Sequence, residues 1–349
     1  MTDLEYILPL WRELESTGAE YVLATVVKTE GSSYRKPGAR MLLAADGRRA
    51  GMVSGGCLEA AVARKAWWLT EDGPAMRPYS TYDDDGELPF GSGCGGVIWI
   101  LLERRKTADA VLLALASAWD ARKPLAIATV LEGEQIAQRA FGATPEEAQM
   151  ALGEGTVPVW VEYCAARPGL WVFGAGDDTK PLVKIARTLG WYVTVADGRS
   201  HLATTGRFAE ADAVRVLPAG GLPRLDLHAC DAAVVKTHSF EQDARILGAL
   251  LVGRVMPAYI GVLGPQRRTR ELLEEVAKRL DLVPHARLIE AWLEQLHAPT
   301  GLDLIGVGGA QTPATIALSI VAEIQKAFTA ATALPLKQVR GLRGAVAQN

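Results

Sequence analysis

Apolar residues follow two different patterns on either side of residue 167. Before it, helical apolar spacing at residues 4–15 is followed by short β-branched runs at 21–27 and 41–45. After it, short apolar runs alternate with glycine-containing loops and helical segments. Such alternation is typical of a parallel sheet with crossover helices. The pattern therefore predicts two domains of different architecture.

The first half of the chain mixes helical and strand patterns without a repeating order. Helical apolar spacing predicts helices at residues 57–69 and 107–120. The apolar, β-branched runs predict strands at 97–102, 125–130 and 157–163. We therefore expect an N-terminal α/β domain over residues 1–166.

The second half has the order of a Rossmann-like, doubly wound parallel sheet. The expected strands are the apolar runs at 170–173, 192–196, 213–216, 232–235 and 259–263. Helices are expected at 181–189 and 314–328, the latter opening on an N-cap threonine and a proline. This Rossmann-like domain should span residues 167–333, with the linker at 167–169 and a basic flexible tail over 334–349.

Composition agrees with a soluble globular protein and excludes several classes. The 349 residues suit two domains, with 49% hydrophobic and 22% charged residues. A net charge of −3 argues against nucleic acid as a partner. The chain has no signal sequence and no apolar run of about 18 residues, so we expect a cytoplasmic protein without a membrane partner. Its four cysteines include no Cys-x-x-Cys pair, which indicates reduced thiols.

Glycine is the one unusual component, with 35 residues against a usual share of about 7%. Thirteen of them fall in four short stretches, at 51–56, 91–96, 174–176 and 301–309. Each stretch joins two expected elements at a point where bare backbone can approach a ligand. The glycines therefore mark candidate binding loops in both domains.

Two of these glycine stretches contain a cysteine. The sequence SGGCLE at 54–59 places Cys57 near a helix N-terminus, where the helix dipole lowers the pKa of a thiol. Cys94 lies in GCGG at 93–96, directly before a strand. Each cysteine could instead be a small buried apolar residue.

A Cys–His pair within the first domain is excluded, because the chain has no histidine before His201. A general base for Cys57 would have to come from the second domain, where His201, His228 and His238 are the nearest in sequence.

The first strand of the second domain ends in FGAG at 173–176, and Asp197 follows 21 residues after Gly176. This is the spacing of a dinucleotide fingerprint, in which turn amides hold a pyrophosphate and the acid holds a ribose hydroxyl. Asp177 and Asp178, however, stand where the phosphate would approach. The alternative is that these two acids cap the helix and complement its dipole.

Two further candidate positions follow later strands of the second domain. His238 comes just after the strand at 232–235, on the side where open α/β sheets bind ligands. Arg267 and Arg268 open a helix after the strand at 259–263, so they could hold an anion. A loop histidine and solvated arginines are the competing interpretations.

Sequence motifs in both domains occur in the order found in one protein family. In the first domain they are GSSYR at 31–35, PGARM at 37–41, SGGCLE at 54–59 and GCGG at 93–96. In the second they are FGAG at 173–176, TH at 237–238, YIGVLG at 259–264, HAPTGLD at 297–303, TP at 312–313 and IALSIVAEI at 316–324. With these motifs the chain resembles the xanthine dehydrogenase accessory protein family of the XdhC/CoxI type.

The resemblance implies an accessory protein rather than an enzyme. Such a protein binds molybdenum cofactor (molybdopterin) as cargo, assists its sulfuration by a cysteine desulfurase, and inserts it into a molybdenum hydroxylase client such as xanthine dehydrogenase. A homodimer is also implied. The competing alternatives are an NAD(P)-dependent oxidoreductase built on the Rossmann-like domain, with NAD(P) as its cofactor, and an enzyme with Cys57 as nucleophile.

The candidate site residues follow from the loops and the matched motifs. Because a thiolate suits a soft metal, Cys57 is the candidate contact to molybdenum, with Glu59 and Cys94 behind it. The cofactor-binding candidates are Arg35, Arg40, Ser54, Gly55, Gly56, Cys57, Glu59 and Cys94 in the first domain, and Gly174, Gly176, Asp197, His238, Arg267 and Arg268 in the second. The chain departs from the family pattern at Asp177, where histidine is common, at Ser239, where aspartate is common, and in a longer loop at 304–310.

Overall fold

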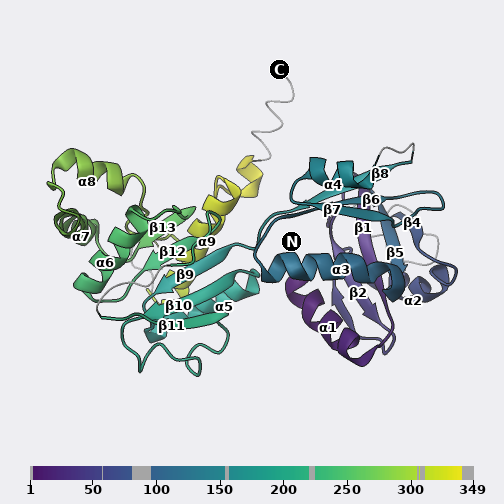
Figure 1. The fold of residues 1–349 in the computed structure, drawn as a ribbon, viewed down its shortest axis with the longest axis horizontal. Coiled ribbons are helices and arrows are strands. Elements are labelled where there is room, and N and C mark those ends of the chain that lie inside the picture. The colour runs from purple at the N-terminus through teal and green to yellow at the C-terminus, as the bar shows by residue number, and fades with distance from the viewer. Residues whose placement is uncertain are drawn as a thin grey trace, which may run out of the picture. The chain divides into compact units, whose positions relative to one another are not determined.

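The structure, a computed structural model, describes residues 3–56, 58–80, 96–153, 157–219, 225–304, 306 and 311–339. The chain divides into two units, Met1–Arg167 and Pro168–Asn349. Both combine helices with β-sheet (Figure 1).

The first unit is mixed α/β, and its elements follow the expected apolar segments closely. The helices are α1 (Leu4–Thr17), α2 (Glu59–Leu69), α3 (Arg105–Asp120) and α4 (Pro145–Leu152). The strands are β1 (Tyr21–Gly31), β2 (Arg40–Ala44), β3 (Arg49–Gly51), β4 (Ala75–Ser80), β5 (Gly96–Arg104), β6 (Leu125–Val130), β7 (Arg139–Gly142) and β8 (Val159–Cys164). Sequence patterns did not predict α4 or the short strands β3, β4 and β7.

The strands of the first unit form two antiparallel sheets, ordered β3-β2-β1-β5-β4 and β7-β6-β8. The alternation along β1 explains how the larger sheet is covered. Val22, Ala24 and Val26 pack with buried residues of α2, whereas Leu23 on the opposite face packs with α1 and α3. Both faces of β1 are therefore buried over most of its length.

Two buried ion pairs join the two sheets of the first unit. Arg40 on β2 binds Glu162 on β8, with Nη1 2.9 Å from Oε1. In the opposite sense, Arg139 on β7 binds Glu103 on β5, with Nη1 2.7 Å from Oε1. All four side chains are at most 11% exposed. Because unpaired buried charge is costly, these crossed pairs should fix how the sheets stack.

The second unit contains the predicted succession of strands and helices. Its strands are β9 (Gly169–Phe173), β10 (Tyr192–Asp197), β11 (Ala213–Val216), β12 (Ala232–Val235) and β13 (Tyr259–Val262). Its helices are the short 3₁₀ helix η1 (Asp177–Thr179), α5 (Lys180–Thr188), α6 (Phe240–Leu251), α7 (Gln266–Arg279), α8 (Ala286–Leu293) and α9 (Pro313–Thr329). As expected, α9 opens on an N-cap, Thr312, followed by a proline.

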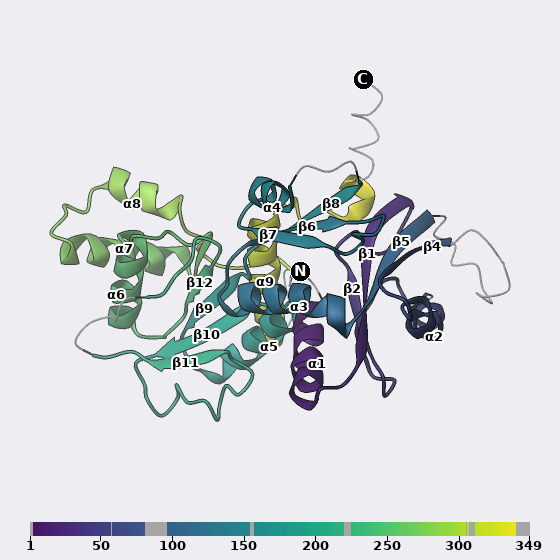
Figure 2. The same cartoon turned by 45° about the vertical axis from the view of Figure 1, so that its right-hand side comes forward.

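All strands of this sheet are parallel, in the order β11-β10-β9-β12-β13. Buried residues of α6, α7 and α8 pack on one face, and those of α5 and α9 pack on the other (Figure 2). This is the strand order and layering of a Rossmann fold. The predicted fold class is therefore confirmed.

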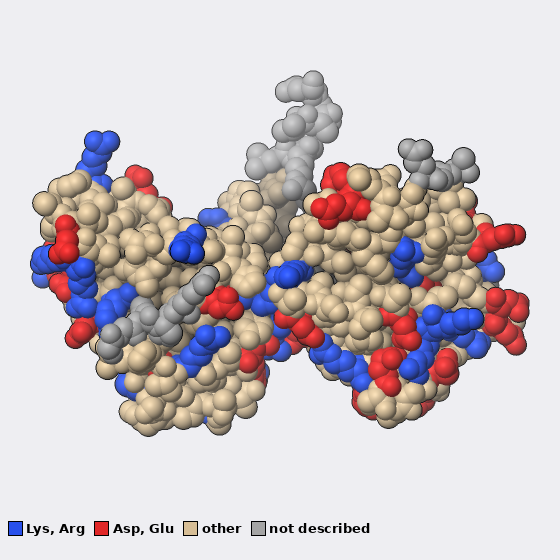
Figure 3. Space-filling view, viewed as in Figure 1, with Lys and Arg blue, Asp and Glu red and all other residues tan. Residues whose placement is uncertain are grey.

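Charged side chains of both signs are interspersed over the face drawn in Figure 3, with no large patch of one sign. Among the described residues, no helix is long and apolar enough to cross a membrane. Most of the expected basic tail, residues 340–349, lies outside the described residues.

Candidate functional site

The glycine loop before α2 is held by a serine and a glutamate from its own sequence. The Ser54 amide donates to Glu59 Oε1 at 2.8 Å, and the Ser54 hydroxyl donates to Glu59 Oε2 at 2.5 Å. The same hydroxyl accepts from the amides of Gly56 at 3.2 Å and Leu58 at 3.1 Å. Ser54 and Glu59 are 5% and 7% exposed, so these bonds are shielded from water. Both side chains therefore shape the loop from within.

The two glycines of this loop are exposed, and one of them requires glycine. Gly56 has φ of 111°, a conformation that side chains other than glycine rarely adopt. The ring of Tyr34 lies over Gly55, since a Cβ placed there would be 3.4 Å from Tyr34 Cγ. Cys57 and Cys94 lie outside the described residues. The structure thus describes the chain on both sides of Cys57 but not the cysteine itself.

The two arginine candidates of the first unit are engaged in ion pairs. Arg35 binds Asp3 through one guanidinium nitrogen, and its side chain is 17% exposed. Arg40 is 5% exposed and binds Glu162. Arg40 is therefore a buried structural group, and the geometry does not favour direct contact with a cofactor.

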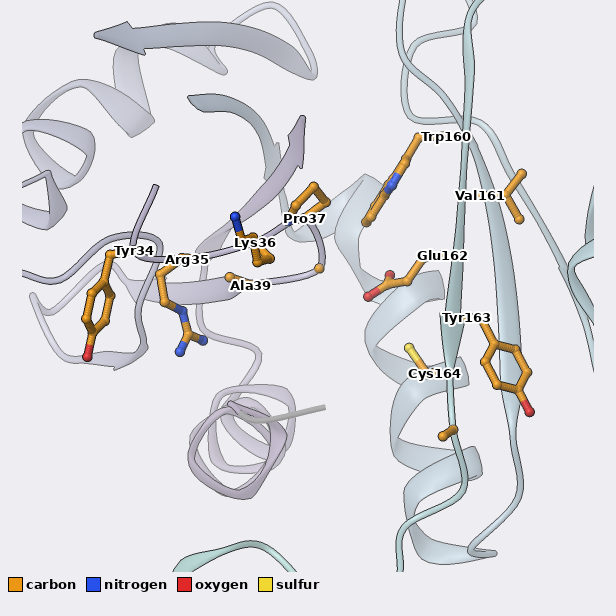
Figure 4. Close-up of a pocket in the computed structure, with 12 residues that line it drawn as sticks. Tyr34, Arg35, Lys36, Pro37, Ala39, Trp160, Val161, Glu162, Tyr163 and Cys164 are labelled. Atoms are coloured by element: carbon orange, nitrogen blue, oxygen red, sulfur yellow. The ribbon is translucent and has the colours of Figure 1, made fainter. Parts of the chain in front are cut away.

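A cavity of about 620 Å³ lies beside the loop that contains Tyr34 (Figure 4). One wall is this loop, and the other is β8 with the residue that follows it. The residues that line it are Tyr34, Arg35, Lys36, Pro37, Gly38, Ala39, Trp160, Val161, Glu162, Tyr163, Cys164 and Ala165. In Figure 4 the side chains of Trp160, Glu162 and Cys164 point from the strand toward the loop.

In the second unit, several candidates meet where the strand order reverses, between the carboxyl ends of β9 and β12. A Cβ at Gly174 would lie 2.4 Å from the carbonyl oxygen of Lys236, and Gly174 has φ of 131°. Only glycine therefore allows the two strand ends to come this close. This is the position at which open α/β sheets bind ligands.

Asp197 lies at this position, but its carboxylate is already occupied. It is fully buried, with Oδ2 accepting from the Ala175 amide at 2.8 Å and Oδ1 accepting from the Arg199 amide at 2.8 Å. The Arg199 guanidinium donates to Oδ2 at 2.7 Å. The Asp197 carboxylate, which was expected to bind a ribose, is already bound to Arg199 and to the Ala175 amide. That amide, which was expected to bind a phosphate, is occupied as well. The residues present therefore do not fit an ordinary dinucleotide.

The neighbouring acids lie in the first turn of η1, where they complement the helix dipole as expected, but neither is the N-cap residue. The N-cap position is held by Gly176, which has no side chain to form a capping bond. Asp177 instead pairs with Lys180 at 2.8 Å and Arg207 at 3.0 Å. Asp178 pairs with Lys236 at 2.7 Å. Asp177 therefore has one local cation, Lys180, and one from a distant part of the chain, Arg207, whereas the cation of Asp178 lies on the neighbouring strand end.

Lys236 was not among the sequence candidates, although it directly follows β12 and lies where the carboxyl ends of β9 and β12 meet. Its side chain is 3% exposed, and Nζ also donates to Thr179 Oγ1 at 3.1 Å. Burial lowers the pKa of Lys236, while Asp178 opposes that effect. A lysine directly after an apolar strand was the available sequence signal.

The remaining candidates of the second unit are His238, Arg268 and Arg267, and they differ in exposure and in the partners they bind. His238 has φ of 62° and its side chain is 65% exposed, with Nε2 4.0 Å from Asp178. Arg268 binds Asp243 at 2.7 Å, and Asp243 also accepts from the Thr237 hydroxyl at 2.6 Å. Arg267 is 89% exposed and pairs with Glu271 on its own helix. Among the described residues, no group of three His, Cys, Asp or Glu side chains is placed to hold a metal ion.

The buried carboxylate of Asp197 should make the free energy of unfolding depend on pH. Burial alone would raise its pKa, but hydrogen bonds from Arg199 and the Ala175 amide outweigh burial and lower it. The stabilisation is therefore complete above the unfolded-state pKa of about 3.9 and is lost as pH falls below it. We expect the free energy of unfolding of Asp197→Asn at pH 7 to be about 1–3 kcal/mol lower than that of the wild type, with the difference shrinking as pH falls toward 3.

Thermal melting at pH 7, 5 and 3 measures this difference as a difference in melting temperature between variant and wild type. Asp120→Asn is the matched control, because Asp120 is exposed in a surface pair with Arg12. A difference in melting temperature between Asp197→Asn and the wild type that stays constant across the three pH values would contradict a stabilising role for the ionised Asp197.

The fold and these positions define a two-unit α/β protein with a glycine loop before a helix in the first unit and a Rossmann domain as the second. The model of the XdhC Rossmann domain matches residues 170–324, and the model of the XdhC and CoxI family matches residues 14–80. The chain belongs to the XdhC and CoxI family, as the sequence motifs indicated.

Relatives match nearly the whole chain. A probable xanthine dehydrogenase subunit of Bacillus subtilis (strain 168) is 32% identical, over 87% of this chain and 92% of that protein. The molybdenum cofactor insertion chaperone PaoD of Escherichia coli (strain K12) is 24% identical, over 92% of this chain and 88% of that protein. A crystal structure described as a xanthine dehydrogenase from Bacillus halodurans has a TM-score of 0.75 at 29% identity, covering 93% of this chain and 96% of that one.

Proposed function

We propose that this chain is an accessory protein that binds molybdenum cofactor as cargo and passes it to a molybdenum hydroxylase. Membership of a family that includes a named molybdenum cofactor insertion chaperone supports an accessory role rather than catalysis. The relative named as a probable xanthine dehydrogenase subunit supports a xanthine dehydrogenase-type client. The structural observation that carries the proposal is the loop at 54–58, which is tied by Ser54 and Glu59 next to Cys57.

In this proposal Cys57 supplies the sulfur ligand. A thiolate binds a soft metal centre. Ser54 before Cys57 and Leu58 after it are held by buried hydrogen bonds. Holding the loop in one conformation lowers the entropy cost of binding cargo. The exposed Gly55 and Gly56 leave the backbone accessible on the same loop. Glu59, which is buried and bound to Ser54, acts by positioning the loop rather than by touching the cargo.

Delivery adds partners to the proposal. A cysteine desulfurase would supply sulfur to the cargo before transfer, and the client would be a molybdenum hydroxylase. We also propose that the chain acts as a homodimer.

An oxidoreductase that uses NAD(P) is not favoured, because Asp197 and the Ala175 amide bind each other.

The direct test uses the full chain purified from cells that make molybdenum cofactor. We expect molybdenum, measured by mass spectrometry, and the fluorescent oxidised pterin to co-purify in equal amounts. The loaded protein should then activate a cofactor-free xanthine dehydrogenase, and more strongly when a cysteine desulfurase has been present. Absence of both molybdenum and pterin from the purified protein would overturn the proposal.

A further inference from the structure

We propose that the cavity between the loop at 33–39 and β8 binds the organic part of the cargo, a planar pterin that carries a phosphate. The inference rests on the proposed function and adds a specific site to it. It assigns Lys36 to the phosphate and the rings of Trp160 and Tyr34 to the pterin.

The cavity borders the glycine loop through one shared residue. Tyr34 lines the cavity, and its ring also lies over Gly55, two residues before Cys57. A ligand in the cavity would therefore be next to the loop that contains the proposed sulfur ligand. The volume of about 620 Å³ lies within the range of roughly 300–1,000 Å³ that is usual for small-molecule sites.

The charge of the lining suits an anion. Arg35 and Lys36 are the cations of the lining, and Glu162 is its carboxylate. Arg40 neutralises Glu162, with Nη1 of Arg40 2.9 Å from Oε1 of Glu162. Burial raises the pKa of Cys164 to about 11, so its thiol is neutral at physiological pH.

Lys36 is the cation of this lining that is left available to bind a phosphate. It is exposed and forms no ion pair with any residue that the structure describes, whereas Arg35 is paired with Asp3. A lysine ammonium binds phosphate as a point charge that can adjust to the ligand.

The wall opposite this cation offers aromatic surface. Trp160 points from β8 toward the loop and faces Pro37 (Figure 4). The indole is partly buried in a cluster that includes Val27 of β1 and Leu101 of β5, which holds it in place. Tyr34 is 70% exposed on the other side of the cavity, so its ring surface is accessible. Flat aromatic side chains are suited to stacking on a heterocycle.

The cavity walls are tied together without any ligand. Arg40 donates to the Gly38 carbonyl at 2.9 Å as well as to Glu162, so a single guanidinium binds both walls. The Gly38 amide donates to the Val26 carbonyl at 2.8 Å, which fixes the loop to β1. Arg40 is thus a positioning residue, and Lys36, Trp160 and Tyr34 are the proposed contacts.

The test compares Lys36→Ala and Trp160→Phe with the wild type, each as the full chain purified from cells that make the cofactor. We expect Lys36→Ala to retain roughly tenfold less pterin, because one charge-assisted contact to phosphate is lost. Raising the salt concentration during purification should reduce retention in the wild type more than in Lys36→Ala, because that contact is screened. Trp160→Phe keeps a ring and should fall between the two.

Lys106→Ala is the matched control, since Lys106 is an exposed lysine at the start of α3 and its replacement removes the same charge elsewhere in this unit. Thermal melting of each variant separates loss of binding from loss of fold. Wild-type retention in a folded Lys36→Ala protein would overturn the cavity assignment while leaving the proposed function intact. Absence of cofactor from the wild type itself would instead overturn the proposed function.

Discussion

Replacing Cys57 with alanine is expected to lower molybdenum retention at least about tenfold, because the proposed sulfur ligand is removed. The loop itself should persist, because Ser54 binds Glu59 and the amides of Gly56 and Leu58 without any contribution from the cysteine side chain. Metal analysis and pterin fluorescence of the purified variant measure the loss.

Cys230→Ala is the control for this prediction, since Cys230 lies in the second unit and is partly buried. It should retain cofactor as the wild type does. Equal molybdenum in Cys57→Ala and the wild type would remove Cys57 from the site. A second variant, Glu59→Gln, tests the loop separately. It keeps the size of the side chain but weakens the charge-assisted bonds to Ser54, so retention should fall less than in Cys57→Ala.

The largest expected effect on stability comes from Arg139→Met in the first unit. Glu103 is fully buried and binds Arg139, so the substitution leaves a carboxylate between the two sheets without its partner. Breaking a buried pair from one side costs about 3–5 kcal/mol. Urea unfolding at pH 7 should show this decrease in the free energy of unfolding.

Two comparisons define what this decrease means. Arg12→Met removes an arginine from an exposed pair with Asp120 and should cost less than about 1 kcal/mol. Adding Glu103→Leu to Arg139→Met removes both charges and should recover much of the lost stability. If Arg139→Met costs no more than Arg12→Met, the crossed ion pairs do not fix the stacking of the sheets.

The short elements of the first unit show why part of the fold escaped prediction. β7 has only four residues, Arg139–Gly142, without an alternating apolar pattern. Its place is set by pairing with β6 and by the bond from Arg139 to Glu103 on another sheet. β4 contains Pro78, a residue that usually argues against a strand, and it lies at the sheet edge where proline is tolerated. Both depend on contacts between residues far apart in sequence.

The glycine residues show the same division within the candidate sites. Their positions in the sequence correctly marked the loop before α2 and the turn after β9. The pairing of Ser54 with Glu59 could also be anticipated as local, because the residues are five apart. That Gly174 must be glycine, however, follows from the Lys236 carbonyl, which lies 62 positions later in the chain.

The sequence by itself determined the α/β class, the Rossmann order of the second unit and the family, because periodic burial and short motifs are local properties of the chain. Only the tertiary structure decided which charged candidates are accessible. Arg40 and Asp197 are buried against partners that folding brings to them, whereas Lys36 is exposed beside a cavity. Sequence spacing cannot distinguish these cases, because the energy of a charge depends on the water and counter-charges around it.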